Sequence, residues 1–388
     1  MPQYTDRLEQ KQYDISPTDD DYIDKLTDVT GMFRTFGEAL TAFLAEHDYI
    51  SFQSPESANR YIRNAFEKTA ITAPRSLPRW FSDGIRPSRK TAFQICFALG
   101  LNFDSTQDFF RRVVLQRGID CHDQTEAAYY FALRHGFPYH KIIAFLQDLS
   151  DFPISTTVQH TPTIFTTDIM SEIDSLETLE DLSVFLKENA AWFGENNRTA
   201  SRFIQQLWDE IAAQNGLAVR ERFLVNKRRN IKNLSIWDIY LQILGLPSKE
   251  IKSIASNRSL KFILKNDKLL HSLAQDSFPD RQGFQLILAG KHVAYERVRK
   301  ILILLSFYSF WANRAISKSE IICRAQGGDA DRCLVEINRF LADSSYPVLY
   351  SGNPYDWLFL FAIQDDYPLE TFRGFMGELF AQGVEHNG

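Results

Sequence analysis

Residues that reverse or break a chain are scarce in this sequence, which has 18 glycines and 14 prolines among 388 residues. Sheet-rich folds need many tight turns, so this scarcity favours long helices joined by short connections. No stretch repeats at a fixed period, so nothing indicates a solenoid of stacked repeats. The sequence therefore predicts an all-α fold.

Cysteines and long apolar runs are also scarce. The four cysteines (Cys96, Cys121, Cys323 and Cys333) form no CxxC pair. The longest apolar run, Ile301–Trp311, is too short to cross a bilayer. The N-terminus is polar and acidic and does not resemble a signal peptide. These features predict a cytoplasmic protein with reduced thiols and no contact with a membrane.

The motifs of common catalytic chemistry are absent as well. No GxxxxGK[ST], GxSxG, HExxH or GxGxxG element occurs. His135 and His140 are five residues apart, off the four-residue spacing that places two metal ligands on one helical face. We therefore expect no enzymatic activity, no metal site and no cofactor.

Charge is distributed unevenly, although the net charge of the whole chain is only -6. Residues 1–59 carry four basic and twelve acidic residues, a local net charge of -8. Residues 60–117 carry eleven basic and four acidic residues, a local net charge of +7. The reversal indicates either an acidic arm beside a basic face or a patchwork of solvated surfaces.

Hydrophobic periodicity and composition divide the chain into segments. Residues 151–168 are rich in Thr, Ser and Pro, as is typical of an interdomain linker. The predicted organisation is an acidic N-terminal arm (1–34), a helical domain with a helix-turn-helix (35–150), the linker (151–168), a helical middle domain (169–282) and a helical C-terminal domain (283–388).

Five short helices are predicted between Phe36 and Leu115. The second is capped by Ser54 or Ser57, and the third by Thr72 with Pro74 in its first turn. Pro87 and Ser88 open the fourth, which Gly100 terminates. Asp104 or Ser105 caps the fifth.

The segment RWFSDGIRPSRKTAFQICFALGLNFDSTQDFF (Arg79–Phe110) carries a resemblance to a known family. An aromatic ends the third helix, a Gly and a basic residue follow, then Pro-Ser, and then a helix ending in Ala-Leu-Gly-Leu. This pattern resembles the XRE family of lambda-repressor-like helix-turn-helix domains, over about 80 residues of the chain. The resemblance implies a bacterial, DNA-binding transcription regulator that acts as a homodimer.

The resemblance also implies which residues contact double-stranded DNA. The third helix would enter the major groove with Arg75, Ser76 and Arg79 near base edges, where an arginine can donate twice to guanine. Phosphate contacts are expected from the following loop and helix start, namely Arg86, Ser88, Arg89 and Lys90. The same surface can be extended by Arg60, Arg63 and Lys68.

Pro78 departs from the family pattern because it falls inside the predicted third helix. If Pro74 opens that helix, Pro78 lies beyond the first turn, where it removes a hydrogen bond. If the helix begins near Arg75, Pro78 is tolerated, but the helix is very short. The alternative function is therefore a helical scaffold or protein-interaction protein that keeps this fold without binding DNA.

Two further segments leave alternatives open, and a third is a candidate strand. The basic stretch Arg220–Lys232 is either a second phosphate contact or a solvated helix end. The aromatic-rich C-terminal region, with Trp311, Tyr350, Tyr355 and Trp357, is either core packing or an interface for dimerisation or a protein partner. Ser344–Tyr350 is the best candidate for a short strand.

Overall fold

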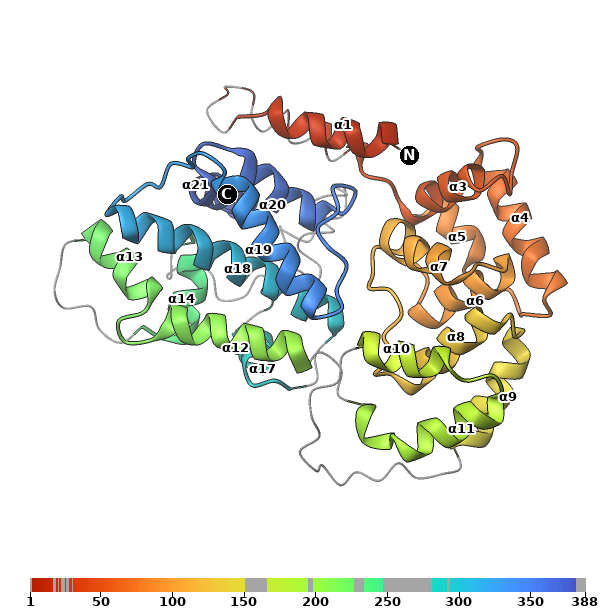
Figure 1. Cartoon of the computed structure of the whole chain (residues 1–388). Helices are drawn as coiled ribbons and strands as arrows, with labels where there is room; N and C mark the ends of the chain where they lie inside the picture. Colours follow the sequence, from red (N-terminus) through yellow and green to blue (C-terminus); the bar gives the residue numbers. More distant parts are fainter. Residues whose placement is uncertain are drawn as a thin grey trace. The chain divides into compact units, whose positions relative to one another are not determined.

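The computed structural model describes residues 2–16, 19, 21, 25, 28–29, 31–150, 166–194, 198–226, 234–246, 279, 281–291 and 294–381. Within these ranges the regular secondary structure is helical and contains no strand, which confirms the predicted all-α fold. Even α18 (Tyr295–Lys318), the longest of the described helices, has no stretch apolar enough to span a bilayer. The chain forms two compact units (Figure 1): unit 1 comprises Arg34–Asn196, and unit 2 comprises Pro2–Phe33 with Asn197–Gly388.

Unit 1 is a bundle of short helices. In chain order these are α3 (Phe36–Glu46), α4 (Pro55–Lys68), α5 (Leu77–Ser82), α6 (Arg89–Leu99), α7 (Phe103–Phe109), a π-helical turn (Phe110–Val114), α8 (Gln124–His135), α9 (Tyr139–Ser150), α10 (Thr166–Asp174), α11 (Leu179–Glu188) and a 3-10 turn (Ala190–Trp192). Residues 151–165 of the predicted linker lie outside the described residues. The sequence prediction groups residues from 169 onwards with a middle domain, whereas α10 and α11 contact α8 and belong to unit 1.

Local capping determines where most of these helices begin and end. Thr35 and Glu38 form a capping box at the start of α3, and Ser54 caps α4. The predicted opening of α6 at Pro87 and Ser88 is confirmed, and Ser88 is its N-cap. The predicted end at Gly100 is confirmed as well, since Gly100 adopts a left-handed φ of 61°. The predicted cap of α7 at Asp104 or Ser105 is wrong. The side chain of Asn102 accepts from Ser105 N instead, because its oxygen lies one turn before that unsatisfied donor.

The core of unit 1 is unusually aromatic. Phe36 of α3 and Trp80 of α5 are buried and meet edge to face, with ring centroids 5.6 Å apart. Gly37 permits this close approach, since a Cβ there would lie 2.5 Å from the carbonyl oxygen of Trp80. The α3–α5 contact therefore fixes the position of the short α5 helix.

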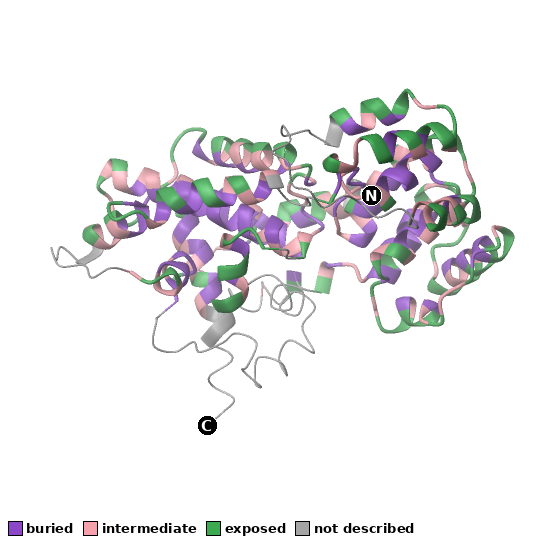
Figure 2. Cartoon of the chain, turned by 90° about the horizontal axis from the view of Figure 1, so that it is seen from below, coloured by how far each residue is buried: buried purple, intermediate pink, exposed green. Residues whose placement is uncertain are grey.

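Unit 2 is built around α18. Its other helices are α1 (Pro2–Tyr13), α12 (Arg198–Ala212), α13 (Leu217–Asn226), α14 (Ile236–Ile243), α17 (Arg281–Leu288), α19 (Asp329–Asp343), α20 (Pro354–Gln364) and α21 (Pro368–Ala381). The α18 helix contacts α12, α13, α19 and α21 and is buried along most of its length. Figure 2 shows that buried residues line the inner sides of the helices in each unit. The side chains of Trp311, Tyr355 and Trp357 lie in this core, whereas Tyr350 is half-buried.

The N-terminal segment completes unit 2. The α1 helix packs against α20, where Leu8 is fully buried and its carbonyl oxygen accepts a hydrogen bond of 3.0 Å from Trp357 Nε1. Ser351 Oγ donates to Glu9 Oε1 at 3.1 Å, and Phe33 packs edge to face on Trp357. Described residues of the segment predicted as an acidic arm, 1–34, thus supply part of the core of unit 2.

The strand predicted at Ser344–Tyr350 is wrong, because the segment contains a turn followed by irregular backbone. Side chains satisfy its backbone groups in place of a partner strand. Arg299 Nη2 donates to the carbonyl oxygen of Pro347 at 3.1 Å, and Leu349 N donates to Asn338 Oδ1 at 2.9 Å. Arg299 also forms a buried two-bond pair with Asp356, with N–O distances of 2.7 and 2.8 Å.

Candidate nucleic-acid interface

The α5 helix begins later than predicted, because Pro78 limits where it can start. The expected cap at Thr72 is wrong: the chain makes a turn at Pro74, and Leu77 is the first helical residue. A helix begun at Pro74 would need an N–H at residue 78 to bond the carbonyl of residue 74, and proline has none. With Pro78 in the first turn no such bond is required. The helix is six residues long, which agrees with the second alternative left open by the sequence.

Arg75, Ser76 and Arg79 lie together at the start of this helix. Arg75 is exposed in the turn before α5, and Ser76 is half-buried at its N-terminus. Arg79 is exposed on α5, where its Nε is 2.9 Å from Asp83 Oδ2. The hydrogen bond from Arg79, with a second from Ser82, lowers the pKa of Asp83, so this pair stays charged.

Arg86 and Ser88 are exposed in the connection between α5 and α6. Ser88 Oγ caps α6 by accepting a hydrogen bond of 3.3 Å from Thr91 N. Its hydroxyl therefore has a structural role, and its exposed position leaves the start of α6 open to a phosphate group.

Arg89 points into unit 1. Its Nε and Nη2 donate to the two carboxylate oxygens of Glu126 at 2.6 and 2.8 Å, and its Nη1 donates to the carbonyl oxygen of Arg117 at 2.9 Å. Arg117 also donates to both oxygens of Glu126, at 2.9 and 3.0 Å. The guanidinium of Arg89 lies 4.7 Å from the ring centroid of Phe110. Arg89 thus holds α6 to the start of α8.

Several other cations of unit 1 face solvent. They share one property: within the described part of the chain no acidic side chain pairs with them. Five of them lie on α4, in the turn before α5 and at the start of α6, namely Arg60, Arg63, Lys68, Arg75 and Lys90. Since α4 packs against both α5 and α6, these cations come from neighbouring elements of one bundle. We call these five residues the basic set.

The second basic stretch, Arg220–Lys232, is only partly described. Glu221 is buried and accepts from Tyr308 Oη and Arg373 Nη1, each at 2.7 Å. Arg222 Nε donates to Gln242 Oε1 at 2.7 Å. Arg220 is exposed on α13, and the other four basic side chains of the stretch fall in residues 227–233, outside the described residues.

The described cysteines of unit 1 are buried, and one of its histidines contacts an acid. Cys96 and Cys121 are buried, and burial raises the pKa of both thiols, so they are neutral. His122 Nδ1 lies 3.0 Å from Asp120 Oδ1. Across the described ranges, no three His, Cys, Asp or Glu side chains gather as metal ligands do.

The sequence pattern gave no signal for the partners of Arg89. Glu126 is 37 residues away, and the carbonyls of Arg117 and Gly118 lie in an irregular segment. Only the packing of α8 beside α6 brings these groups together. Comparisons of the chain with protein families, with curated proteins and with solved structures find no match.

Proposed function

We propose that unit 1 binds double-stranded DNA, chiefly through its phosphates, and that the protein is a DNA-binding transcription regulator. The observation that carries the proposal is the basic set, since exposed cations without acidic partners are available to phosphates. Neutralising phosphates releases counterions from DNA, and this release supplies much of the affinity of such contacts.

Base reading in this proposal depends on Arg75 and Arg79. Arg75 has no acidic partner among the described residues, whereas Arg79 must leave Asp83 before it can donate to a base. That ion pair is exposed and screened by water, so breaking it costs little. Arg75 is therefore the principal candidate for contact with guanine. Arg89 is not among the proposed DNA contacts, because its donors are directed to Glu126 and to main-chain carbonyls.

The experiment compares two triple variants of the full chain in fluorescence-anisotropy titrations of a labelled duplex at several salt concentrations. R60A/R63A/R75A removes three members of the basic set. R202A/K291A/R339A removes the same charge from exposed positions of unit 2. Each lost phosphate contact lowers the slope of log K against log salt by about 0.9, so the first triple variant should lose up to about 2.7.

The control triple variant should retain the wild-type slope. The proposal fails if the wild type shows no affinity for duplex at low salt. It also fails if the two triple variants weaken binding equally, because only overall charge would then matter.

A second candidate is a helical scaffold that binds a protein. It is favoured by the acidic partners of Arg79 and Arg89, which tie up two of the cations expected to face DNA. Absence of duplex binding, together with capture of a protein through unit 1, would support this candidate instead.

We further propose that the protein acts in the cytoplasm as a homodimer, because two half-sites multiply affinity for DNA. A protein partner at the C-terminal region belongs to the same proposal. Sedimentation equilibrium of the full chain, with and without duplex, measures the subunit number directly.

A further inference from the structure

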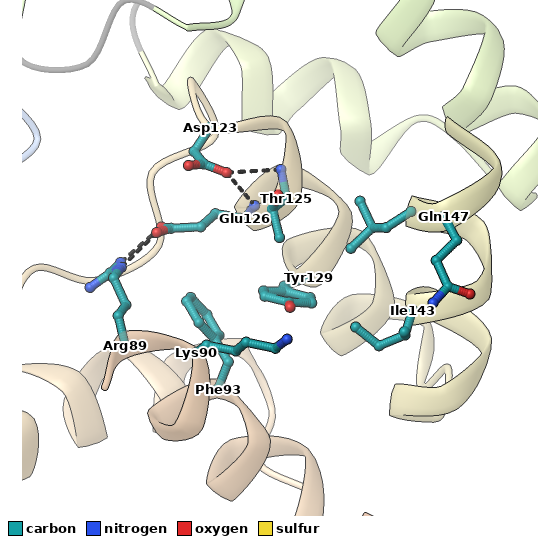
Figure 3. Close-up of a pocket in the computed structure, with 10 residues that line it drawn as sticks. Arg89, Lys90, Phe93, Asp123, Thr125, Glu126, Tyr129, Ile143 and Gln147 are labelled. Carbon is teal, nitrogen blue, oxygen red and sulfur yellow. Dashed lines mark hydrogen bonds and ion pairs between the residues drawn. The ribbon is translucent and has the colours of Figure 1, made fainter. Parts of the chain in front are cut away.

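A pocket of about 470 Å³ opens within unit 1, between α6, the start of α8 and α9 (Figure 3). This volume lies in the range of small-molecule sites, roughly 300–1,000 Å³. Neither the DNA-binding proposal nor the core packing of the unit accounts for it.

The inner surface of the pocket is aromatic and aliphatic. Phe93 and Tyr129 are buried, and their ring centroids are 4.8 Å apart with the rings tilted by 44°. Ile143 and Leu146 of α9 line the pocket and are half-buried. Figure 3 shows Ile143 across an open space from Tyr129. Such walls suit a flat apolar group, because aromatic rings pack well in offset or edge-to-face contact.

The two carboxylates that line the pocket already have partners. Asp123 Oδ1 accepts from Thr125 N and Glu126 N, at 2.9 and 3.1 Å, and so caps α8. Glu126 is held by Arg89 and Arg117, and its carboxylate also accepts from Asp120 N at 2.9 Å. The charge of Glu126 is thus compensated by two guanidinium groups, whereas Asp123 keeps its charge and faces the N-terminus of α8.

The charge left without a partner is that of Lys90. Its ammonium makes no ion pair within the described residues, and Figure 3 shows the side chain extending past Phe93 and Tyr129 towards Ile143. Burial raises the pKa of the Tyr129 phenol, which is therefore neutral and adds no negative charge beside the ammonium. The lining thus combines an apolar floor with one cation that has no ion pair, Lys90, because the other cation, Arg89, is paired with Glu126.

We propose that this pocket binds a small aromatic monocarboxylate. Its ring packs on Phe93 and Tyr129 and against Ile143 and Leu146, and its carboxylate accepts from Lys90 Nζ. The hydroxyl of Thr125, at the pocket edge, is a further donor within the lining.

A regulatory consequence follows, and this part rests on the proposed DNA binding. Lys90 belongs to the basic set, so a carboxylate that pairs with it removes one cation from the phosphate-binding surface. Bound ligand should therefore weaken DNA binding, as an inducer does.

The test is isothermal titration calorimetry of the full chain, without DNA, using benzoate, 4-hydroxybenzoate and indole-3-acetate, each beside its uncharged primary amide. At least one acid should bind, and its amide should bind about tenfold more weakly or worse, because a hydrogen bond to a charged group is lost. K90M keeps the aliphatic stem of Lys90 and should lower the affinity for the acid by about tenfold or more.

K141M is the matched control, because Lys141 is an exposed lysine of α9 that does not line the pocket. It should bind the acid as the wild type does. The proposal is overturned if no acid binds with a Kd below about 1 mM. Equal affinities of K90M and K141M for the acid would overturn the proposal as well.

A separate titration with labelled duplex tests the regulatory part. Acid that binds in the pocket and lowers duplex affinity of the wild type, but not of K90M, supports it. Acid binding without any duplex binding leaves the pocket proposal intact and refutes the proposed function. Duplex binding that is indifferent to bound acid refutes only the regulatory link.

Discussion

Buried charge in unit 1 is concentrated at one carboxylate, Glu126, which receives hydrogen bonds from Arg89 and Arg117. Asp120 adds a second negative charge 3.2 Å from Arg117 Nη1. Removing one member of a buried ionic group is costly, because the remaining charges lose their compensation. The cluster therefore joins α6 to α8. Protonation of one of its carboxylates should weaken this connection.

The pKa of Asp120 determines how the stability of unit 1 changes with pH. Burial by itself would raise the pKa of Asp120, but the hydrogen bond from His122 and the charge of Arg117 outweigh it, so the pKa is lowered below 3.8. A carboxyl whose pKa is lower in the folded state than in the unfolded state stabilises the folded state at pH values above its unfolded pKa. The stabilisation is lost as pH falls from 3.8 through the folded pKa.

We expect the free energy of unfolding, measured by urea titration, to fall as pH drops below about 4. D120N should be less stable at neutral pH and show a shallower fall in this window. D343N, at an exposed position on α19, should retain the wild-type pH dependence. If the free energy of unfolding falls equally with pH in D120N and the wild type, Asp120 is not the group responsible for the fall.

At the scale of the element, the short α5 helix depends on its contact with α3. Six residues are too few to form a stable isolated helix. Packing of Leu77 and Trp80 into the core therefore holds it in place. Gly37 is the point of closest approach, because its missing side chain leaves room for the backbone of Trp80 and Phe81.

G37A should destabilise unit 1 by about 1–3 kcal/mol, although alanine is the better helix former. The new Cβ would lie 2.5 Å from Trp80 O and 2.8 Å from Phe81 Cα, and backbone atoms cannot move aside cheaply. G374A is the matched control, since Gly374 is an exposed glycine of α21 with open space at its Cβ position. It should be neutral or stabilising by up to about 1 kcal/mol in chemical denaturation. Equal effects of the two substitutions would show that α3 and α5 do not meet this closely.

Helix boundaries were predictable where neighbouring residues determine them. The start of α3 after Thr35 and the whole of α8 follow from local caps and periodicity. The start of α5 was mispredicted because two prolines competed for the first turn. The partners of Arg89 depend on tertiary packing over 37 residues, which no local pattern encodes. For the same reason, the basic charge of residues 60–117 was predictable, but which of its cations remain unpaired was not.

At the scale of the whole molecule, unit 2 is assembled from both ends of the sequence. Its N-terminal part contributes Leu8, Ile15, Val29 and Phe33 to the same buried cluster as α18 and α20. Hydrophobic periodicity shows that such residues are apolar, but it does not show which distant segment covers them. The acidic composition of residues 1–34 therefore suggested a separate arm.

L8A should destabilise unit 2 by about 2–5 kcal/mol, because it removes a fully buried side chain. Hydrogen exchange followed by mass spectrometry should show faster exchange in α20, whose Trp357 bonds the backbone of residue 8. Exchange in α6 and α8 of unit 1 should not change. Q10A, at an exposed position of α1, is the control. Unchanged exchange in α20 of L8A would show that α1 contributes little to unit 2.

The pairing of Leu8 with Trp357 also sets an order of events during protein synthesis. The two residues are 349 positions apart, so the ribosome finishes the whole of unit 1 before it makes α20, against which α1 packs. At a synthesis rate of roughly 5–20 residues per second, the apolar side of α1 is made about 20–70 s before Trp357 of α20. During that interval it is a nascent segment that chaperones can bind. Unit 1 can fold meanwhile, and unit 2 is completed only after α20 has been synthesised.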